Sequence, residues 1–485
     1  NRDNHKVKAC RDTLGGEGYA ILWKGDRIFV TGSGENYGRG TLYGAYELLR
    51  LFGCEFYASD TETVPQRGNL SLPRKDKVEK PVFEYRDVYW SAVFDEQISA
   101  KLHRNGNLAH QISPEYGGGV FYAGPHFVHT FDLLVPPDTY FESHPEYYSE
   151  INGERTARHL YSQLCMTNDD VLEIALNKVR EWLDAEPDAR IVSVSQNDSF
   201  VIDSYCTCPS CKAIIDEEGS PMGPLLRFVN RIADSLKVDY PSVAVDLLAY
   251  QYSVTPPKKT VPRDNVIVRY CTGGCNAHSI QECSRNENAK NCIQTWGKVC
   301  DRIYIWNYTT NFAQYLCPFP NFYTLKDDII FFRDNGVKGI FEQGMYQGGV
   351  SGEFGELRAY VLSELLWDPS LDTDALINGF MNAYYGHGAF KVKEYFDLVH
   401  QAVRQDGRHF NLVQNCADIF DGLVDEAAIS YLDGIWSDAK AACKEGSKEH
   451  THRTVLYQRL YHSVSLMPAI SDATYCSFAM SQNGA

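Results

Sequence analysis

The stretch ARIVSVSQNDS, residues 189–199, decides the fold, because a run of apolar and small side chains ends abruptly in polar ones. Five further stretches predict strands: YRDVYW (85–90), VAVDLLAY (243–250), NVIVRYC (265–271), RIYIWNY (302–308) and VKGIFEQ (337–343). Several of them are apolar at successive positions, which is typical of parallel strands buried on both faces. Segments with helical spacing separate the strands, at residues 168–185, 221–238 and 324–335. The alternation predicts an α/β fold with a (β/α)8 TIM-type barrel at residues 80–370.

Segments on either side of the barrel predict two further domains. GYAILWKGDRIFVTG (18–32) alternates apolar and polar residues around a turn, and GRGTLYGAYELLRLFG (38–53) has helical spacing. They predict a small N-terminal α/β domain at residues 1–75, joined to the barrel by a Pro- and charge-rich linker at residues 64–81. After Asp368 the strand pattern gives way to amphipathic helices at 373–385, 390–405 and 426–444, which predict a C-terminal helical domain at residues 371–485.

The composition excludes several classes of function. The chain is 44% hydrophobic but has no apolar run approaching the ~18 residues of a membrane-spanning helix, so we predict no membrane-spanning segment. A net charge of −17 offers no basic surface to nucleic acid. GSGENYGRG (32–40) is similar to a phosphate loop but lacks the Lys-Ser/Thr ending, and we predict no cofactor. The 31 Tyr, 24 Phe and 7 Trp would suit stacking on sugars, although most such rings pack in cores.

Cysteines are unusually frequent and clustered. Eight of the 15 lie between Cys206 and Cys300, which leaves disulfides, buried thiols or zinc as explanations. We favour disulfides and thiols, because the spacings do not form two clean CxxC pairs, and we assign no metal ligand. CTCPSC (206–211) is interpreted as support for the neighbouring loop, through disulfide or metal closure. The cysteine content, and a chain that begins at Asn1 without Met, predict a mature or truncated segment of a secreted, periplasmic or cell-surface protein.

Two carboxylates follow predicted strands and are candidates for chemistry. The carboxyl ends of barrel strands meet at one rim, where such enzymes build their active sites. Asp198 follows the strand 189–196, and Glu342 precedes the glycine-bearing loop of GIFEQGMYQGG (339–349). A pair of carboxylates at this rim could protonate a glycosidic oxygen and stabilise the oxocarbenium-like centre. The structural alternatives are a turn or helix-capping role for Asp198 and a salt bridge for Glu342.

Aromatic and amide side chains at the same strand ends are candidates for substrate binding. Aromatic rings could stack on the apolar face of a pyranose, and amides and hydroxyls could bind an acetamido group. Core packing is the alternative for each ring. No metal-ligand spacing surrounds the histidines of AGPHFVHTF (123–131), so we expect no metal role for them. The candidates are Gln196, Trp90, His126, Tyr250, Gln251, Trp306, Asn307, Tyr308 and Tyr346.

Several of these segments together resemble known glycoside hydrolases. The N-terminal hairpin and helix resemble the small domain that precedes the barrel in β-hexosaminidases and α-glucuronidases. The remaining segments are similar to glycoside hydrolase family 163, with its DUF4838-type barrel: SVSQND…YCTCPSCKAI…GPLLRFVNRIAD…LLAYQYSVTPPK, YIWNYTTNF…LCPFPNF and FFRDNGVKGIFEQG. The likeness covers about residues 15–400.

The resemblance implies a retaining endo-β-N-acetylglucosaminidase that cleaves the GlcNAc-β1,4-GlcNAc core of complex N-glycans on glycoproteins. Related acetamido-sugar hydrolases use the acetamido oxygen of the substrate as nucleophile and pass through an oxazolinium ion. Carried over onto this chain, Asn197 would orient the acetamido group and Asp198 would be the general acid/base. Asn197 departs from the aspartate that is common at its position. Glu342 would then stabilise the oxazolinium charge or exchange roles with Asp198.

Three other functions are compatible with the sequence. An exo-acting β-hexosaminidase or α-glucuronidase would share the N-terminal domain and the barrel but have a closed pocket. A catalytically inactive glycan-binding protein would use the aromatic side chains without a working acid. In a structural or adhesive surface protein, the cysteines would serve only as stabilising cross-links. Barrels host many chemistries, so the site residues must decide between these functions.

Overall fold

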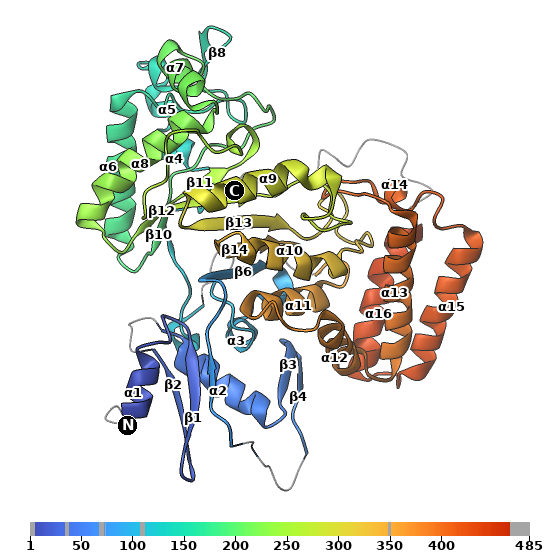
Figure 1. Ribbon diagram of the computed structural model, residues 1–485. Coiled ribbons are helices and arrows are strands. Elements are labelled where there is room, and N and C mark those ends of the chain that lie inside the picture. The colour runs from blue at the N-terminus through green and yellow to red at the C-terminus, as the bar shows by residue number, and fades with distance from the viewer. Residues whose placement is uncertain are drawn as a thin grey trace.

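A seven-stranded parallel sheet forms the centre of the protein (Figure 1). The structure is a computed structural model and describes residues 5–33, 38–66, 72, 74–106, 112–347 and 351–465. The strand order is β6-β14-β13-β12-β11-β10-β7, and every neighbouring pair is parallel. The strands are β6 (Tyr85–Tyr89), β7 (Tyr122–Ala123), β10 (Ile191–Ser193), β11 (Ala244–Ala249), β12 (Val266–Cys271), β13 (Ile303–Tyr308) and β14 (Val337–Gln343).

The sheet curls, so its two edge strands approach each other. The rings of Tyr85 on β6 and Tyr122 on β7 lie with centroids 6.4 Å apart. The Arg269 guanidinium, on the central strand β12, lies 5.4 Å from the Tyr85 ring and 5.9 Å from the Tyr122 ring. Asp246 accepts hydrogen bonds from Arg269 Nε at 3.0 Å and from Nη2 at 2.6 Å. The concave inner face is therefore a packed layer of rings around a buried ion pair.

A short segment, Asn105–Gly106, joins the two edges of the sheet. The backbone amides of both residues donate to the Arg86 carbonyl of β6, at 3.2 and 3.3 Å. The Val120 amide, just before β7, donates to the Asn105 carbonyl at 2.8 Å, and Gly106 forms a parallel bridge with Val120. The prediction of eight strands differs from this arrangement: among the described residues seven strands make up the central sheet, and two residues connect its edges.

Helices cover the convex face of the sheet. Successive strand residues point to opposite faces, so every second side chain packs against these helices. On β14, Phe341 packs with the inner rings, whereas Ile340 packs with the main core on the helix side. The predicted helices 168–185, 221–238 and 324–335 are confirmed to within two residues by α6, α8 and α10. The helices are α3 (Glu96–Lys101), α6 (Asp169–Ala185), α8 (Met222–Asp239), α9 (Glu287–Val299), α10 (Phe322–Asp334) and α11 (Gly355–Trp367).

A small antiparallel sheet with two helices precedes the central sheet (Figure 1). Its elements are α1 (His5–Arg11), β1 (Tyr19–Lys24), β2 (Arg27–Gly32), α2 (Gly40–Leu51) and β5 (Lys77–Glu79), of which the hairpin β1–β2 and the helix α2 agree with the prediction. β5 lies within the predicted linker and pairs with β1, so part of that linker belongs to the N-terminal sheet. The phosphate-loop-like segment overlaps residues 34–37, which lie outside the described residues.

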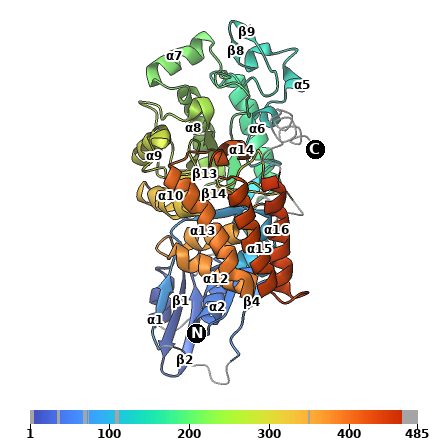
Figure 2. The ribbon, with the colours of Figure 1, turned by 90° about the vertical axis from the view of Figure 1, so that its right-hand side faces the viewer.

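Helices follow the strands of the central sheet, and Figure 2 shows α13, α15 and α16 side by side. They are α12 (Thr373–Tyr385), α13 (Ala389–Asp406), α14 (Cys416–Phe420), α15 (Glu426–Ala442) and α16 (Lys448–Ser465). Of these, α12, α13 and α15 lie within two residues of the predicted ranges. A disulfide between Cys317 and Cys416 ties this helical region to the loop after β13. None of the described helices has the length and apolar character needed to cross a membrane.

Candidate active site

Partly exposed aromatic side chains gather at the carboxyl edge of the curled sheet. Trp306 and Tyr308 alternate with Asn307 on β13, and both remain half-buried rather than fully covered. The Trp306 ring stacks on Phe127 at 5.5 Å and its Nε1 donates to Gln343 Oε1 at 2.8 Å. Tyr308 is level with Gln343, and Gln343 with Tyr89, in the strand register. These side chains form a continuous aromatic and amide surface across three strands.

Asp198 supplies a carboxylate to this surface. It follows β10, is half-buried, and its Oδ1 accepts the Ser199 backbone amide at 2.9 Å. Burial, followed by the charge of Asp198 and a hydrogen bond with it, raises the pKa of Tyr250 above its usual value. Burial also raises the pKa of Tyr308, and Asp198 contributes to that increase. Asp198, Tyr250 and Tyr308 therefore interact electrostatically, and both phenols stay protonated as hydrogen-bond donors.

His129 lies beside the same carboxylate and is held in a fixed orientation. Its backbone amide donates to Ser195 Oγ at 2.8 Å, and its Nδ1 lies 2.8 Å from the Gln196 carbonyl, which can only accept a hydrogen bond. Burial lowers the pKa of His129, while Asp198 opposes that shift. A neutral imidazole with a proton on Nδ1 keeps Nε2 as an acceptor, which suits a sugar hydroxyl.

The other residues predicted beside Asp198 serve the loop rather than the open surface. Asn197 is buried, and its amide donates to Asp132 Oδ1 at 2.7 Å and accepts the Asp132 backbone amide at 3.1 Å. The Gln196 amide donates to the Leu248 carbonyl at 3.1 Å. Gln251 Nε2 donates to the Ser199 carbonyl at 2.8 Å. Each of these amides fixes the loop that carries Asp198.

Glu342 lies on the opposite face of the sheet from the one that the sequence predicts. It is fully buried, its Oε2 accepts from Asn307 Nδ2 at 2.9 Å, and it lies near buried Asp328 of α10. Burial raises the pKa of Glu342 to about 8. Because its neighbour Phe341 faces the inner rings, Glu342 must face the helices. Asn307 shares that face, so neither side chain joins Asp198.

Three further predicted binding residues have different surroundings. Trp90 is fully buried and its Nε1 donates to Thr309 Oγ1 at 2.9 Å, so its ring belongs to the core and not to the open surface. His126 is exposed and close enough to His129 to lower that residue's pKa slightly further. Tyr346 is half-buried and stacks on Tyr89 with ring centroids 5.3 Å apart.

Four side chains of this surface are not among the predicted binding residues: Tyr89, Phe127, His129 and Gln343. The period of two along a strand is a signal that could have identified Gln343. Trp306 and Tyr308 must share one face of β13, and the residues level with them on β14 are Phe341 and Gln343. No comparable signal marks His129, which has a left-handed backbone (φ 56°) in a loop.

Two groups of cysteines lie outside this surface. The Sγ atoms of Cys165, Cys206, Cys208 and Cys211 all lie within 4.8 Å of one another. A second group brings together Cys275, Cys283 and His409, with His409 Nδ1 3.2 Å from the Cys275 sulfur. The four cysteines of the first group form no disulfide with one another and are buried free thiols, one of the three states that the sequence leaves open.

A comparison with protein families identifies the family of this chain. Residues 56–397 match the family described as Domain of unknown function (DUF4838). The chain belongs to the DUF4838 family. A search of curated proteins found no match. The DUF4838 match contains all seven strands of the central sheet and every residue of the candidate site.

Glycoside hydrolases are among the solved structures that a structural search matched to the chain. One is a GH138 enzyme targeting pectin rhamnogalacturonan II, with a TM-score of 0.42 and 9% identity over 96% of the DUF4838 chain and 64% of its own. A GH89 enzyme variant from Clostridium perfringens, in complex with its substrate GlcNAc-alpha-1,4-galactose, has a TM-score of 0.41 and 10% identity over 93% and 66%. The chain thus spans slightly less than two thirds of the length of each.

Proposed function

We propose that this DUF4838 protein is a retaining glycoside hydrolase, an endo-β-N-acetylglucosaminidase acting on the chitobiose core of complex N-glycans. The observation that carries the proposal is the half-buried Asp198 carboxylate among Tyr250, Tyr308 and Trp306 at the carboxyl edge of the sheet. An acid/base beside rings and hydrogen-bond donors is what cleavage of a glycosidic bond requires. The endo-acting and β-specific parts of the proposal rest on the resemblance to glycoside hydrolase family 163.

Asp198 is the general acid/base in this proposal. It would protonate the departing glycosidic oxygen and later take a proton from the attacking water. The protonated Tyr250 hydroxyl, which interacts with Asp198, would donate to the carboxylate and so orient it. Trp306 would stack on a pyranose ring, and neutral His129 would accept a hydrogen bond from a sugar hydroxyl.

Substrate-assisted catalysis suits this arrangement better than a covalent carboxylate nucleophile. A covalent pair needs two carboxyl groups ~5–5.5 Å apart across the scissile bond. Glu342 faces the helices while Asp198 faces the aromatic surface, so the two cannot flank one bond without a large rearrangement. The acetamido oxygen of the substrate would be the nucleophile instead. Since the Asn197 amide is used by Asp132, we assign the orientation of the acetamido group to the Tyr308 hydroxyl.

The proposal extends to the barrel and to the location of the protein. We propose that Asn105–Gly106 serve as the short eighth strand of a (β/α)8 barrel, since their backbone hydrogen bonds link both edges of the sheet. On that count β10 is the fourth strand, which agrees with the position of the acid/base in related acetamido-sugar hydrolases. A secreted, periplasmic or cell-surface location fits the Cys317–Cys416 disulfide.

Mass spectrometry of a glycoprotein with complex N-glycans, before and after incubation with the protein, tests the function. Release of the glycan, with one GlcNAc left on asparagine, is the expected result. Stepwise loss of terminal sugars would indicate an exo-acting enzyme. Intact glycan that still binds the protein would indicate an inactive glycan-binding protein, which the same aromatic surface could support. The Asp198→Asn variant is the control for contaminating activity.

A further inference from the structure

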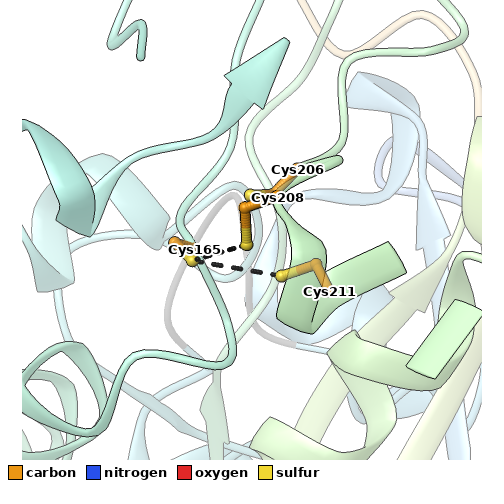
Figure 3. A group of neighbouring side chains, drawn as sticks. All are labelled: Cys165, Cys206, Cys208 and Cys211. Atoms are coloured by element: carbon orange, nitrogen blue, oxygen red, sulfur yellow. Dashed lines mark hydrogen bonds between the residues drawn. The ribbon is translucent and has the colours of Figure 1, made fainter. Parts of the chain in front are cut away.

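Four buried thiols converge between the loop that carries Asp198 and a segment upstream of it (Figure 3). Cys206, Cys208 and Cys211 come from the loop and the start of α7 (Pro209–Glu218), and Cys165 comes from the upstream segment. All four are at most 4% exposed, and they form a cluster of their own, separate from the main core. A group this buried and this rich in sulfur needs an explanation beyond packing.

The spacing of the sulfurs matches a tetrahedral metal site. Cys165 Sγ lies 3.7 Å from Cys208 Sγ and 4.0 Å from Cys211 Sγ. Four sulfurs bound to zinc at ~2.3 Å are separated by ~3.8 Å, whereas a disulfide needs ~2.05 Å. Three ligands in the spacing Cys-x-Cys-x-x-Cys with a fourth from a distant segment form the four-cysteine set of structural zinc sites.

Hydrogen-bond donors surround the sulfurs and would offset the negative charge of thiolates. The Glu150 backbone amide donates to Cys206 Sγ at 3.3 Å, and Arg155 Nη1 lies 3.7 Å from the same atom. The Thr167 hydroxyl lies 3.2 Å from Cys211 Sγ. Donors of this kind normally orient and stabilise the thiolate ligands of a metal.

We infer that Cys165, Cys206, Cys208 and Cys211 bind one structural zinc ion, and that this ion holds the Asp198 loop in place. The metal would join two segments with little regular structure. One is the Asp198 loop up to Cys208, and the other is residues 142–168, whose only strands have two residues each, β8 (Glu150–Ile151) and β9 (Glu154–Arg155). With so few backbone hydrogen bonds of regular structure, these segments would gain a fixed cross-link from the metal. Thiolate ligands in a tetrahedral set favour zinc, a closed site that performs no chemistry itself.

The zinc site is connected to the candidate active site by a short chain of hydrogen bonds. Gln163, two residues before Cys165, accepts the Asn197 backbone amide at 2.8 Å and donates to the Asn197 carbonyl at 3.0 Å. The Leu160 carbonyl accepts Ser199 Oγ at 3.1 Å. Asp198 lies between these two anchored residues, so a change at the cysteines should alter its position.

Metal analysis of the purified protein tests the zinc site independently of activity. We expect wild type and Cys292→Ser to contain the same amount of zinc, and Cys208→Ser and Cys211→Ser to contain one equivalent less. Cys292 is a buried free thiol outside both cysteine groups, which makes it a matched control. The test rests on the difference in zinc content between the variants and the wild type. The total content is not enough, because Cys275, Cys283 and His409 could hold a metal of their own. Equal zinc in all four proteins, or iron in place of zinc, would overturn the proposal.

Two measurements on the wild-type protein avoid the risk that a cysteine variant fails to fold. Replacement of the metal by Co²⁺ should give the charge-transfer absorption of thiolate ligands, and a spectrum without it would contradict the assignment. Alkylation of the denatured protein with chelator but without reductant should modify all four cysteines. Disulfide-linked peptides from this cluster would show that the sulfurs pair with one another instead.

Hydrogen exchange tests whether the ion holds the loop. After removal of zinc by a chelator, we expect faster exchange in residues 147–168 and 196–211, with the strands β12 to β14 unchanged. Unchanged exchange in both segments would refute the positioning role. We also expect removal of zinc to lower turnover at least about tenfold and added zinc to restore it. This expectation rests on the proposed function. Zinc and exchange are measured without substrate, so their failure can be distinguished from failure of that function.

Discussion

Asn307 Nδ2 donates a hydrogen bond to Glu342 Oε2 at 2.9 Å on the helix-facing side of the sheet, and Asn307 Oδ1 accepts from Thr272 Oγ1 at 2.9 Å. Glu342 Oε1 is buried without a hydrogen-bond partner. Burial raises the pKa of Glu342 to about 8, so the buried carboxyl group is protonated at neutral pH. This polar row faces the helices, on the opposite side of the strands from Phe341.

Glu342→Gln should therefore raise stability at neutral and alkaline pH. The folded pKa of about 8 exceeds the ordinary 4.5, so the wild-type free energy of unfolding falls as the pH rises between these values. Glutamine keeps the acceptor for Asn307 and removes this loss, which is on the order of 3–5 kcal/mol above pH 8. Urea unfolding at several pH values measures the difference, which should vanish below about pH 4.5.

The same variant separates a structural role from a catalytic one. We expect Glu342→Gln to keep kcat within about threefold of wild type, because the side chain faces away from Asp198. Exposed Glu173→Gln on α6 is the control for removal of a carboxylate. A hundredfold loss of kcat with unchanged folding would instead return Glu342 to the mechanism.

Strands and helices were predictable here because their signals are local. The apolar runs located six of the seven central strands to within three residues, and helical spacing located α6, α8, α10, α12, α13 and α15 to within two. The missing strand, β7, has two residues, and Asn105–Gly106 is as short, so neither produces a pattern. Both depend on pairing with distant segments, which sequence spacing does not encode.

The site was only partly predictable. The face of the sheet on which a side chain lies depends on the alternation along its strand and on tertiary contacts. Asp198, Tyr250, Trp306 and Tyr308 were identified from their positions after apolar runs. Asn307 and Glu342 were grouped with them although the period of two places them on the other face. Cys165 could not be linked to Cys208, 43 residues away, until the fold brought their sulfurs together.

Asp198→Asn should abolish most of the turnover while leaving the fold intact. Loss of a general acid/base costs ~10²–10⁴-fold in rate, and Asn keeps the size of the side chain and an acceptor for the Ser199 amide. Aryl glycosides have leaving groups that need little protonation, so the loss should be smaller on them than on the glycoprotein. Steady-state kinetics on both substrates measures this. The matched control is Asp203→Asn, an exposed carboxylate of the same loop.

Trp306→Ala should weaken substrate binding more than it slows the chemical step. A ring that stacks on a sugar contributes binding energy in the ground state and the transition state alike, which raises KM on removal. An aromatic contact is worth about 1 kcal/mol, so we expect KM to rise ~5–10-fold. Trp306→Phe keeps a ring but loses the hydrogen bond to Gln343, so its KM should lie between those of the wild type and Trp306→Ala. A fall in kcat alone would argue against stacking; Trp23→Ala, on β1, controls for loss of a remote indole.

Removal of Arg269 should leave the inner face with an unpaired buried acid. Asp246 is 1% exposed and Arg269 is fully buried, so Arg269→Met leaves a carboxylate that water cannot reach. Breaking such a pair costs about 3–5 kcal/mol, whereas the double variant with Asp246→Leu removes both charges and should recover most of the loss. Urea unfolding of four proteins, the wild type, Arg269→Met, Asp246→Leu and the double variant, forms a double-mutant cycle. Burial already raises the pKa of Asp246, and without Arg269 it should rise further, so the single variant should regain stability as the pH falls. An equal loss in the single and double variants would mean that packing, and not the unpaired charge, causes the destabilisation.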